Sequence, residues 1–117
     1  MKTQQLEVAG LVQVWTLKMR SMARSAYSDR FIISQISNAA LSAHLNLVEG
    51  HASIYPAEQL KFFSTARGSV AEALAGMAIL EAEGRVPRSL ADQLRADGDQ
   101  ISRMLWGLMR TRMKKKG

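Results

Sequence analysis

The sequence contains no cysteine, and this absence limits the chemistry open to the chain. It excludes disulfide bonds and a thiolate nucleophile, and it argues strongly against a structural zinc site. No run of about 18 apolar residues occurs, so no membrane-spanning helix is expected. The opening stretch, MKTQQLEVAG, lacks the apolar core of a secretory signal. We therefore expect a cytoplasmic protein.

Proline is almost as scarce, with only Pro56 and Pro87, and each follows a polar or glycine-containing break. A proline in that place fits the first turn of a helix. No Asn-Gly or Asp-Gly pair separates alternating apolar runs, so no β-structure is expected. A chain of 117 residues is expected to form one domain, residues 1–117.

Apolar residues recur at helical spacing in four segments, at about residues 4–27, 30–50, 56–83 and 88–113. Ser28 or Asp29 is expected to cap the second helix, and Gly50 and Gly84 are expected to end the second and the third. The connections are short, which forces consecutive helices to run antiparallel. The predicted fold is therefore an all-α, up-down-up-down antiparallel four-helix bundle.

One apolar stripe on each helix is expected to form the core of the bundle. In the second helix small residues dominate the stripe, which lets a neighbouring helix approach closely. The predicted core residues are, in chain order, Leu11, Val14, Trp15, Met22 and Ala26; Ile32, Ile36, Ala39, Ala40, Ala43 and Leu47; Leu60, Phe63, Ala66, Val70, Leu74, Met77 and Leu80 or Ala78; and Leu90, Leu94, Ile101, Leu105, Leu108 and Met109.

The positive charge is concentrated near the C-terminus. Residues 1–102 hold ten Lys or Arg and ten Asp or Glu, whereas residues 103–117 hold six cations and no acid, so the net +6 belongs to this last segment. Such an excess favours nucleic acid, anionic lipid or an acidic partner, although cations near a helix C-terminus also complement the helix dipole. Residues 110–117 form a basic tail. The cations predicted to contact nucleic acid are Arg20, Arg24, Arg103, Arg110, Arg112, Lys114, Lys115 and Lys116.

Few residues fit catalysis or metal binding. The di-iron sites of four-helix bundles need Glu-x-x-His pairs, but neither His44 nor His51 follows a glutamate by three residues. There is no G-x-S-x-G elbow, and the stretch RGSVAE, residues 67–72, falls inside a predicted helix rather than after a strand. We therefore predict no enzymatic activity, no metal and no cofactor. Gly68 and Ser69 are expected to bring the third helix close to a neighbour.

Four motifs occur in a recognisable order: Ser34-Gln35-Ile36, Ala39-Ala40-Leu41-Ser42, Asn46-Leu47-Val48-Glu49-Gly50 and Ala66-Arg67-Gly68-Ser69-Val70-Ala71-Glu72. Together with the last predicted helix, they resemble the bacterial four-helix-bundle proteins that are encoded within intervening sequences of 23S rRNA genes. The resemblance covers most of the chain. The sequence departs from the family pattern at Asn38 and His44, where the family has arginine and proline.

The resemblance implies a bundle that assembles into a ring-like homopentamer and has no established enzymatic activity. A similar fold and pentamer belong to the accessory variability determinant of diversity-generating retroelements, a basic protein that binds its reverse transcriptase and nucleic acid. The partners implied by the resemblance are further copies of the chain, RNA or DNA, and a reverse transcriptase or another protein.

Asn46 and Glu49 share one face of the second helix because three residues separate them. An acid in the last turn of a helix is unfavourable with the helix dipole, so Glu49 needs a compensating donor. We predict that both side chains are buried or half-buried and hydrogen-bonded, and that they tie the helix end to the start of the third helix or to a neighbouring protomer. The set of structural or interface residues is Asn46, Glu49, Gly50, Gly68, Ser69 and Glu72.

The predicted function is that of a non-catalytic subunit of a ring-like homo-oligomer, associated with nucleic acid through its basic ends. The alternative is a protein-binding adaptor, in which the small-residue face of the second helix and exposed Met and Trp side chains dock a partner. Trp15 and Trp106 are expected to pack against the core or a partner subunit. The other interpretation of these tryptophans is an aromatic platform on which bases stack.

Overall fold

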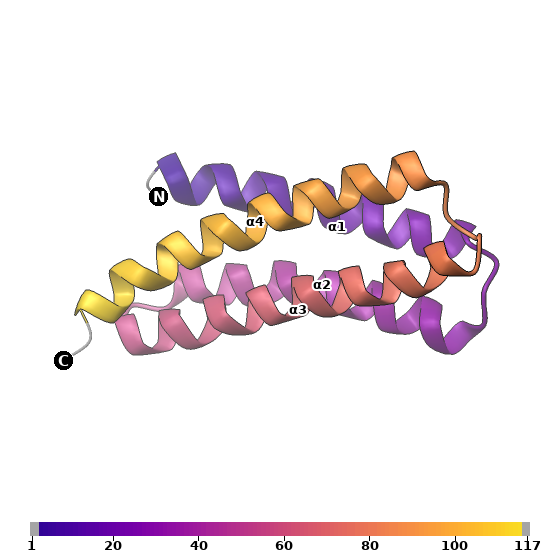
Figure 1. Cartoon of the computed structure of the whole chain (residues 1–117). Coiled ribbons are helices and arrows are strands. Elements are labelled where there is room, and N and C mark those ends of the chain that lie inside the picture. Colours follow the sequence, from indigo (N-terminus) through magenta and orange to yellow (C-terminus); the bar gives the residue numbers. More distant parts are fainter. Residues whose placement is uncertain (1–2, 116–117) are drawn as a thin grey trace.

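The computed structural model describes residues 3–115, with side chains for residues 7–114, and this part of the chain is four helices without a strand. Consecutive helices run antiparallel, and the molecule measures 48 × 24 × 18 Å (Figure 1). The predicted up-down-up-down bundle is confirmed. The helices are α1 (Thr3–Ser25), α2 (Arg30–Ala52), α3 (Pro56–Ala82) and α4 (Arg88–Lys115).

The helix boundaries follow the polar, proline and glycine signals of the sequence. The carboxylate of Asp29 caps α2 by accepting a hydrogen bond from the Ile32 N–H at 3.0 Å. Pro56 occupies the first turn of α3, where its missing N–H costs nothing. Gly84 has a φ of 74°, a left-handed conformation that ends α3 and that favours glycine. These boundaries agree with the predictions.

Gly50 does not end α2, so that prediction is wrong. The helix continues to Ala52, and Ser53 closes it by donating its N–H and its Oγ–H to the Glu49 carbonyl, both at 3.0 Å. Gly50 is instead buried against Phe63 of α3. Gly50 therefore allows α2 and α3 to pack closely, and it does not form the turn that follows α2.

The core lies between all four helices and contains most of the predicted apolar stripes. Trp15 is fully enclosed, and its indole N–H donates to the Leu94 carbonyl at 3.0 Å, which joins α1 to α4. Thr16 donates its hydroxyl to the Ala40 carbonyl at 3.0 Å and joins α1 to α2. Among the described residues, no helix is both long and apolar enough to cross a lipid bilayer.

The stripe predicted for α1 is partly wrong. Leu11 and Val14 lie outside the core, and Val14 is 52% exposed. The core face of α1 consists instead of Val8, Val12, Trp15, Met19, Met22, Ala23 and Ala26. Apolar residues surround this helix, so their spacing alone does not select a face, and the face that fits Trp15 against α4 is the one that is buried.

We predict that Gly50→Ala destabilises the fold. The added Cβ would lie 2.5 Å from Cε1 of Phe63, a ring that is itself buried, so α2 and α3 must move apart. We expect a loss of about 1–3 kcal/mol in the free energy of unfolding, measured by urea denaturation.

Gly10→Ala is the matched control for Gly50→Ala, because a Cβ at Gly10 meets nothing within 4 Å. This change should raise the stability by about 0.5–1 kcal/mol, the usual advantage of alanine over glycine inside a helix. Equal effects of the two substitutions would show that close approach is not the reason for Gly50.

Candidate nucleic-acid interface

The last turns of α4 carry cations that have no carboxylate partner within residues 3–115. Arg103, Arg110 and Lys114 are exposed, and the ion pairs of the described part all belong to other cations, namely Arg85, Arg88 and Arg95. The side chain of Lys115 and all of Lys116 lie outside the described residues. Arg103, Arg110 and Lys114 therefore face solvent and are available to an anionic partner.

Arg112 differs from its neighbours because it is held against the bundle. Its guanidinium carbon lies 5.5 Å from the centre of the Phe63 ring, and its Nε donates to Oε1 of Gln59 at 3.0 Å. A further hydrogen bond runs from Nη1 to the Thr111 hydroxyl at 2.7 Å. Burial lowers the pKa of the Arg112 guanidinium from its ordinary value. The contact joins α4 to α3, so Arg112 has a structural role that the sequence did not predict.

His51 lies on another side of the same Phe63 ring. The two ring centres are 5.5 Å apart in an edge-to-face arrangement, and Nε2 of His51 is buried without a hydrogen-bond partner among the described residues. Burial lowers the pKa of His51, and the positive charge of Arg112 lowers it further. The imidazole is therefore neutral at pH 7, and it adds no charge to this end of the bundle.

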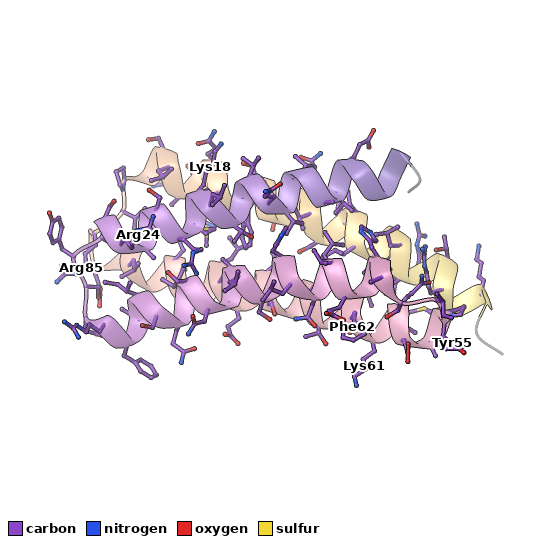
Figure 2. The ribbon with its side chains drawn as sticks, turned by 180° about the vertical axis from the view of Figure 1, so that it is seen from behind. Lys18, Arg24, Tyr55, Lys61, Phe62 and Arg85 are labelled. Carbon is purple, nitrogen blue, oxygen red and sulfur yellow. The ribbon has the colours of Figure 1, made fainter. Side chains whose placement is uncertain are left out.

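Of the cations toward the opposite end of the bundle, some are hydrogen-bonded or paired, whereas Lys18, Arg24 and Arg30 are exposed and form no ion pair within the described residues. Arg85 donates to the Tyr27 carbonyl at 2.6 Å and pairs with Glu83 at 3.3 Å. Arg20 is half-buried and donates to the Ser37 carbonyl at 3.4 Å, whereas Arg24 is exposed. Figure 2 shows Arg24 and Arg85 at this end, far from Tyr55 at the other. Of the cations predicted here, Arg24 fits a nucleic-acid contact better than Arg20.

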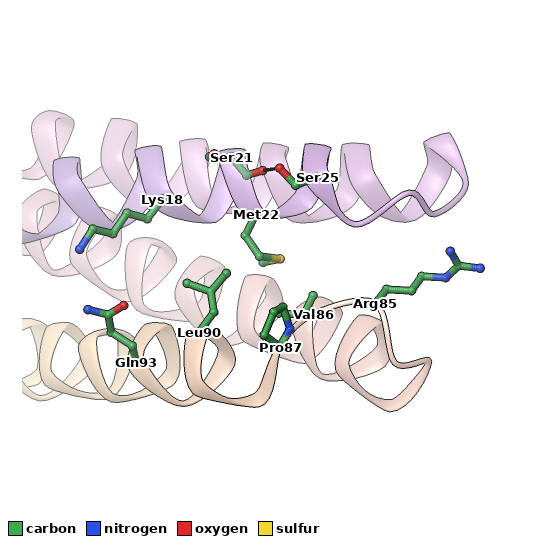
Figure 3. Close-up of a pocket in the computed structure, with 9 residues that line it drawn as sticks. All are labelled: Lys18, Ser21, Met22, Ser25, Arg85, Val86, Pro87, Leu90 and Gln93. Atoms are coloured by element: carbon green, nitrogen blue, oxygen red, sulfur yellow. Dashed lines mark hydrogen bonds between the residues drawn. The ribbon is translucent and has the colours of Figure 1, made fainter.

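A cavity of about 340 Å³ opens between α1 and α4 near that end (Figure 3). In the view, Lys18 and Gln93 lie at one side of the cavity and Arg85 points away from it. Its lining is mainly apolar and contains no carboxylate, so it holds no pair of groups for acid–base catalysis. The lining residues are Lys18, Ser21, Met22, Ser25, Arg85, Val86, Pro87, Leu90 and Gln93.

The motif residues of α2 and α3 form a short hydrogen-bonded chain between the two helices. Asn46 is half-buried, as expected, and its Nδ2 donates to the Ser42 carbonyl at 2.9 Å and to Ser42 Oγ at 3.1 Å. Ser42 Oγ is in turn hydrogen-bonded to Ser69 Oγ at 2.9 Å. The link joins α2 to the middle of α3, not to its start. Ser42 lies in a quoted motif, but it was not predicted as a site residue.

The other motif residues point outward. The Glu49 side chain is exposed, and its carboxylate has no hydrogen bond or ion pair within the described part, so the prediction that it ties α2 to α3 is wrong. Glu72 is exposed as well. Gly68 is exposed, and a Cβ there would meet nothing within 4 Å, so Gly68 does not serve packing within the chain, contrary to the prediction. The contact of Glu49 with a neighbouring protomer stays a prediction.

Across the described residues, no three His, Asp or Glu side chains lie together in an arrangement that could hold a metal ion. His44 and His51 each leave one ring nitrogen buried without a partner, but neither faces a set of carboxylates.

The fold and the motifs together define a class, a small four-helix bundle with one basic end. Residues 8–107 match the model of the 23S rRNA-intervening sequence protein family, and the chain belongs to this family. No curated protein matches the sequence.

A similar crystal structure is that of a protein of unknown function from the S23 ribosomal protein family of Bacteroides thetaiotaomicron, with a TM-score of 0.86. The alignment covers 92% of this chain and 99% of that one. Only 13% of the residues are identical, so the similarity concerns the fold alone.

We predict that the fold loses stability as the pH falls from 7 to 5, in part through His51. Its pKa is below the ordinary value of 6.5 in the folded state, so the unfolded chain binds the proton more tightly. The contribution of the neutral His51 to the free energy of unfolding is fully present above pH 6.5. It is lost as the pH falls through the lowered pKa that His51 has in the folded chain. The midpoint temperature of thermal unfolding should fall with decreasing pH in the native chain. In His51→Gln this midpoint should depend less steeply on pH over the same range. Parallel slopes would exclude His51 as the cause.

Proposed function

We propose that the chain is a non-catalytic subunit of a ring-like homo-oligomer, a pentamer as in the family it resembles, which associates with RNA or DNA through the basic end of α4. The observation that carries this proposal is the set of exposed cations without acid partners, Arg103, Arg110 and Lys114, ahead of Lys115 and Lys116. Phosphate contacts with Lys and Arg release counterions and supply most of the affinity of proteins for nucleic acids in the absence of sequence recognition.

Assembly would multiply these weak contacts. Each chain carries a net charge of +6, nearly all of it near one end, and a ring of chains presents several such ends to one strand. Once one end has bound, the others meet the same strand at a high effective concentration. The α4 end is the better candidate because residues 103–117 hold no acid, whereas Arg85 and Arg88 at the opposite end pair with Glu83 and Asp92.

The outward carboxylates offer a place for contact between protomers. Glu49 follows Asn46 by three residues, and Glu72 follows Ser69 by three, so both lie on the same side of the linked pair α2 and α3. Neither has an ion-pair partner within residues 3–115. A cation of a neighbouring protomer would supply the donor that Glu49 lacks near the C-terminal end of α2.

The second candidate function is a protein-binding adaptor, for a reverse transcriptase or another protein. The small-residue face of α2 cannot serve it, because Ala39, Ala40 and Ala43 are buried in the core. The observation that favours this candidate is the exposure of large apolar side chains on α1 and α2, which include Val14, Leu17 at 63%, Leu45 and Val48. Exposed apolar surface of this kind is typical of protein interfaces.

We predict that changing Lys114, Lys115 and Lys116 to alanine weakens binding to a labelled RNA oligonucleotide and leaves folding intact. The logarithm of the affinity should depend less steeply on the logarithm of the salt concentration, by about one unit for each lysine that contacts a phosphate. Fluorescence anisotropy between about 50 and 200 mM salt measures both effects. The matched control is alanine at Lys18, Arg30 and Arg88, three exposed cations away from the C-terminal end of α4.

An affinity that is unchanged by salt would contradict phosphate contacts and would favour the adaptor. Arg112 is left out of the variant because its loss would also remove the contact with Phe63. Equal losses in the variant and the control would mean that the charge of the whole chain matters rather than the α4 end.

We predict a pentamer, a particle with about five times the 12.9 kDa mass of the chain by light scattering, as the resemblance implies. Glu49→Gln should lower this mass on dilution, while the helix content of the chain stays unchanged, because the Glu49 carboxylate is exposed and has no partner within the described part. Glu58→Gln, which alters an exposed acid in the first turn of α3, is the control. A monomer at every concentration would overturn the oligomer, and an unaffected mass would exclude Glu49 from the interface.

A further inference from the structure

We propose that Trp106 and three arginines around it form a binding site for a single nucleic-acid strand on the outer face of α3 and α4, where a base stacks on the indole and the arginines hold phosphates. This inference rests on the proposed function, and it adds base stacking beside Arg103 and Arg110, two of the cations that carry that proposal. It stands on four observations: an exposed tryptophan, a groove beside it, an unexplained glycine, and unpaired cations.

Trp106 is the exposed member of the two tryptophans. It is 39% exposed, whereas Trp15 is 1% exposed and hydrogen-bonded in the core. The guanidinium carbon of Arg67, on α3, lies over the Trp106 ring at 5.4 Å from its centre. Such a cation–π contact orients the indole and still leaves part of it open. A half-open, oriented aromatic ring is the kind of platform on which an unpaired base stacks.

A groove of about 420 Å³ lies beside this pair, since Arg67 also lines the groove. It runs between α3 and α4, two neighbouring helices in Figure 1. Two hydroxyl groups and one guanidinium face it, and none of its lining residues is acidic. The lining residues are Ser64, Arg67, Gly68 and Ala71 of α3, with Ser102 and Met109 of α4.

Gly68 has no explanation inside the chain. It lies in the middle of α3, where glycine lowers helix stability relative to alanine, and a Cβ at this position would meet nothing within 4 Å. By contrast, Gly50 is needed because Phe63 lies against it. A glycine in the wall of an open groove lets another molecule approach the helix backbone closely. The groove next to Trp106 therefore has room where a side chain would otherwise stand.

Two more arginines lie on the same side of α4 as Trp106. Arg103 precedes it by three residues and Arg110 follows it by four, which places all three side chains along one face of the helix. Arg103 and Arg110 are exposed, and within residues 3–115 neither they nor Arg67 form an ion pair. Asp99, one turn before Arg103, is not within ion-pair distance of it. One guanidinium, that of Arg67, thus lies over the indole, and Arg103 and Arg110 flank Trp106 along α4, with no ion pair to an acid within the described residues.

The charge of this face favours a nucleic-acid strand over a second copy of the chain. A strand brings one phosphate for each base, so it matches an aromatic ring flanked by cations. A second copy that met this face with its own would bring the same arginines, which repel one another. Contact between copies at this face is therefore kept as an outcome of the test.

The experiment compares a base-containing strand with a polyanion that has no bases. An oligouridylate should quench the fluorescence of the native protein, and Trp106→Phe should remove most of that quenching, because Trp15 is enclosed. Trp106→Ala should weaken oligouridylate binding about 5- to 100-fold, and Trp106→Phe should weaken it less, since phenylalanine still stacks. Binding of inorganic polyphosphate should be unaffected by either change. Phe31→Ala, which removes an exposed aromatic ring from α2, is the matched control.

Gly68→Ala gives an independent test that does not disturb the fold. It should leave the free energy of unfolding unchanged or raise it, as for Gly10→Ala, and it should weaken oligouridylate binding about 5-fold or more by narrowing the approach to the groove. Unchanged binding in this variant would exclude a strand in the groove.

The outcomes separate this inference from the proposed function. If the lysine variants of the α4 end lose affinity while Trp106→Ala does not, the stacking site is wrong and the proposed function stands. Equal losses for oligouridylate and polyphosphate would also exclude stacking. If no strand binds at all, both proposals fail. Trp106 fluorescence that shifts with protein concentration, and not with added strand, would identify this face as a contact between copies and would overturn the inference.

Discussion

The close approach of α2 and α3 determines the position of the other groups at the basic end of the bundle. Gly50 and Gly76, one near the end of α2 and the other in α3, each receive a large side chain of the opposite helix, Phe63 and Ile36 respectively. Between these two contacts, Ser42 and Ser69 are hydrogen-bonded across the same pair of helices. Among neighbouring helices, α2 packs most extensively against α3, and the contact between α1 and α4 is the smallest.

Phe63 connects the contact between α2 and α3 to the charged residues of α4. Its ring is buried against Gly50 on one side and carries the guanidinium of Arg112 and the imidazole of His51 on others. Arg112 is thereby held, while Arg110 and Lys114 of the same helix remain in solvent. One cation of this segment, Arg112, therefore stabilises the bundle, and the others are available to a partner. Contact with the Phe63 ring, not a difference in charge, distinguishes them.

The motif residues that identify the family serve two purposes. Asn46 and Ser69 belong to the hydrogen-bonded link between α2 and α3, and this use is complete within one chain. Glu49, Gly68 and Glu72 lie outward and make no contact that explains them. Residues of the second kind fit contacts beyond the chain, which is why both proposals draw on them.

The sequence alone determined the four helices, their boundaries at Asp29, Pro56 and Gly84, and the excess of positive charge in the last segment. These features depend on local backbone chemistry, on helical spacing and on composition, all of which are written along the chain. Only the tertiary structure decided which face of α1 is buried, that Gly50 is a contact rather than an end, and that Arg67 lies over Trp106. These features depend on distances between residues far apart in the chain, and helical spacing contains no information about the neighbouring helix.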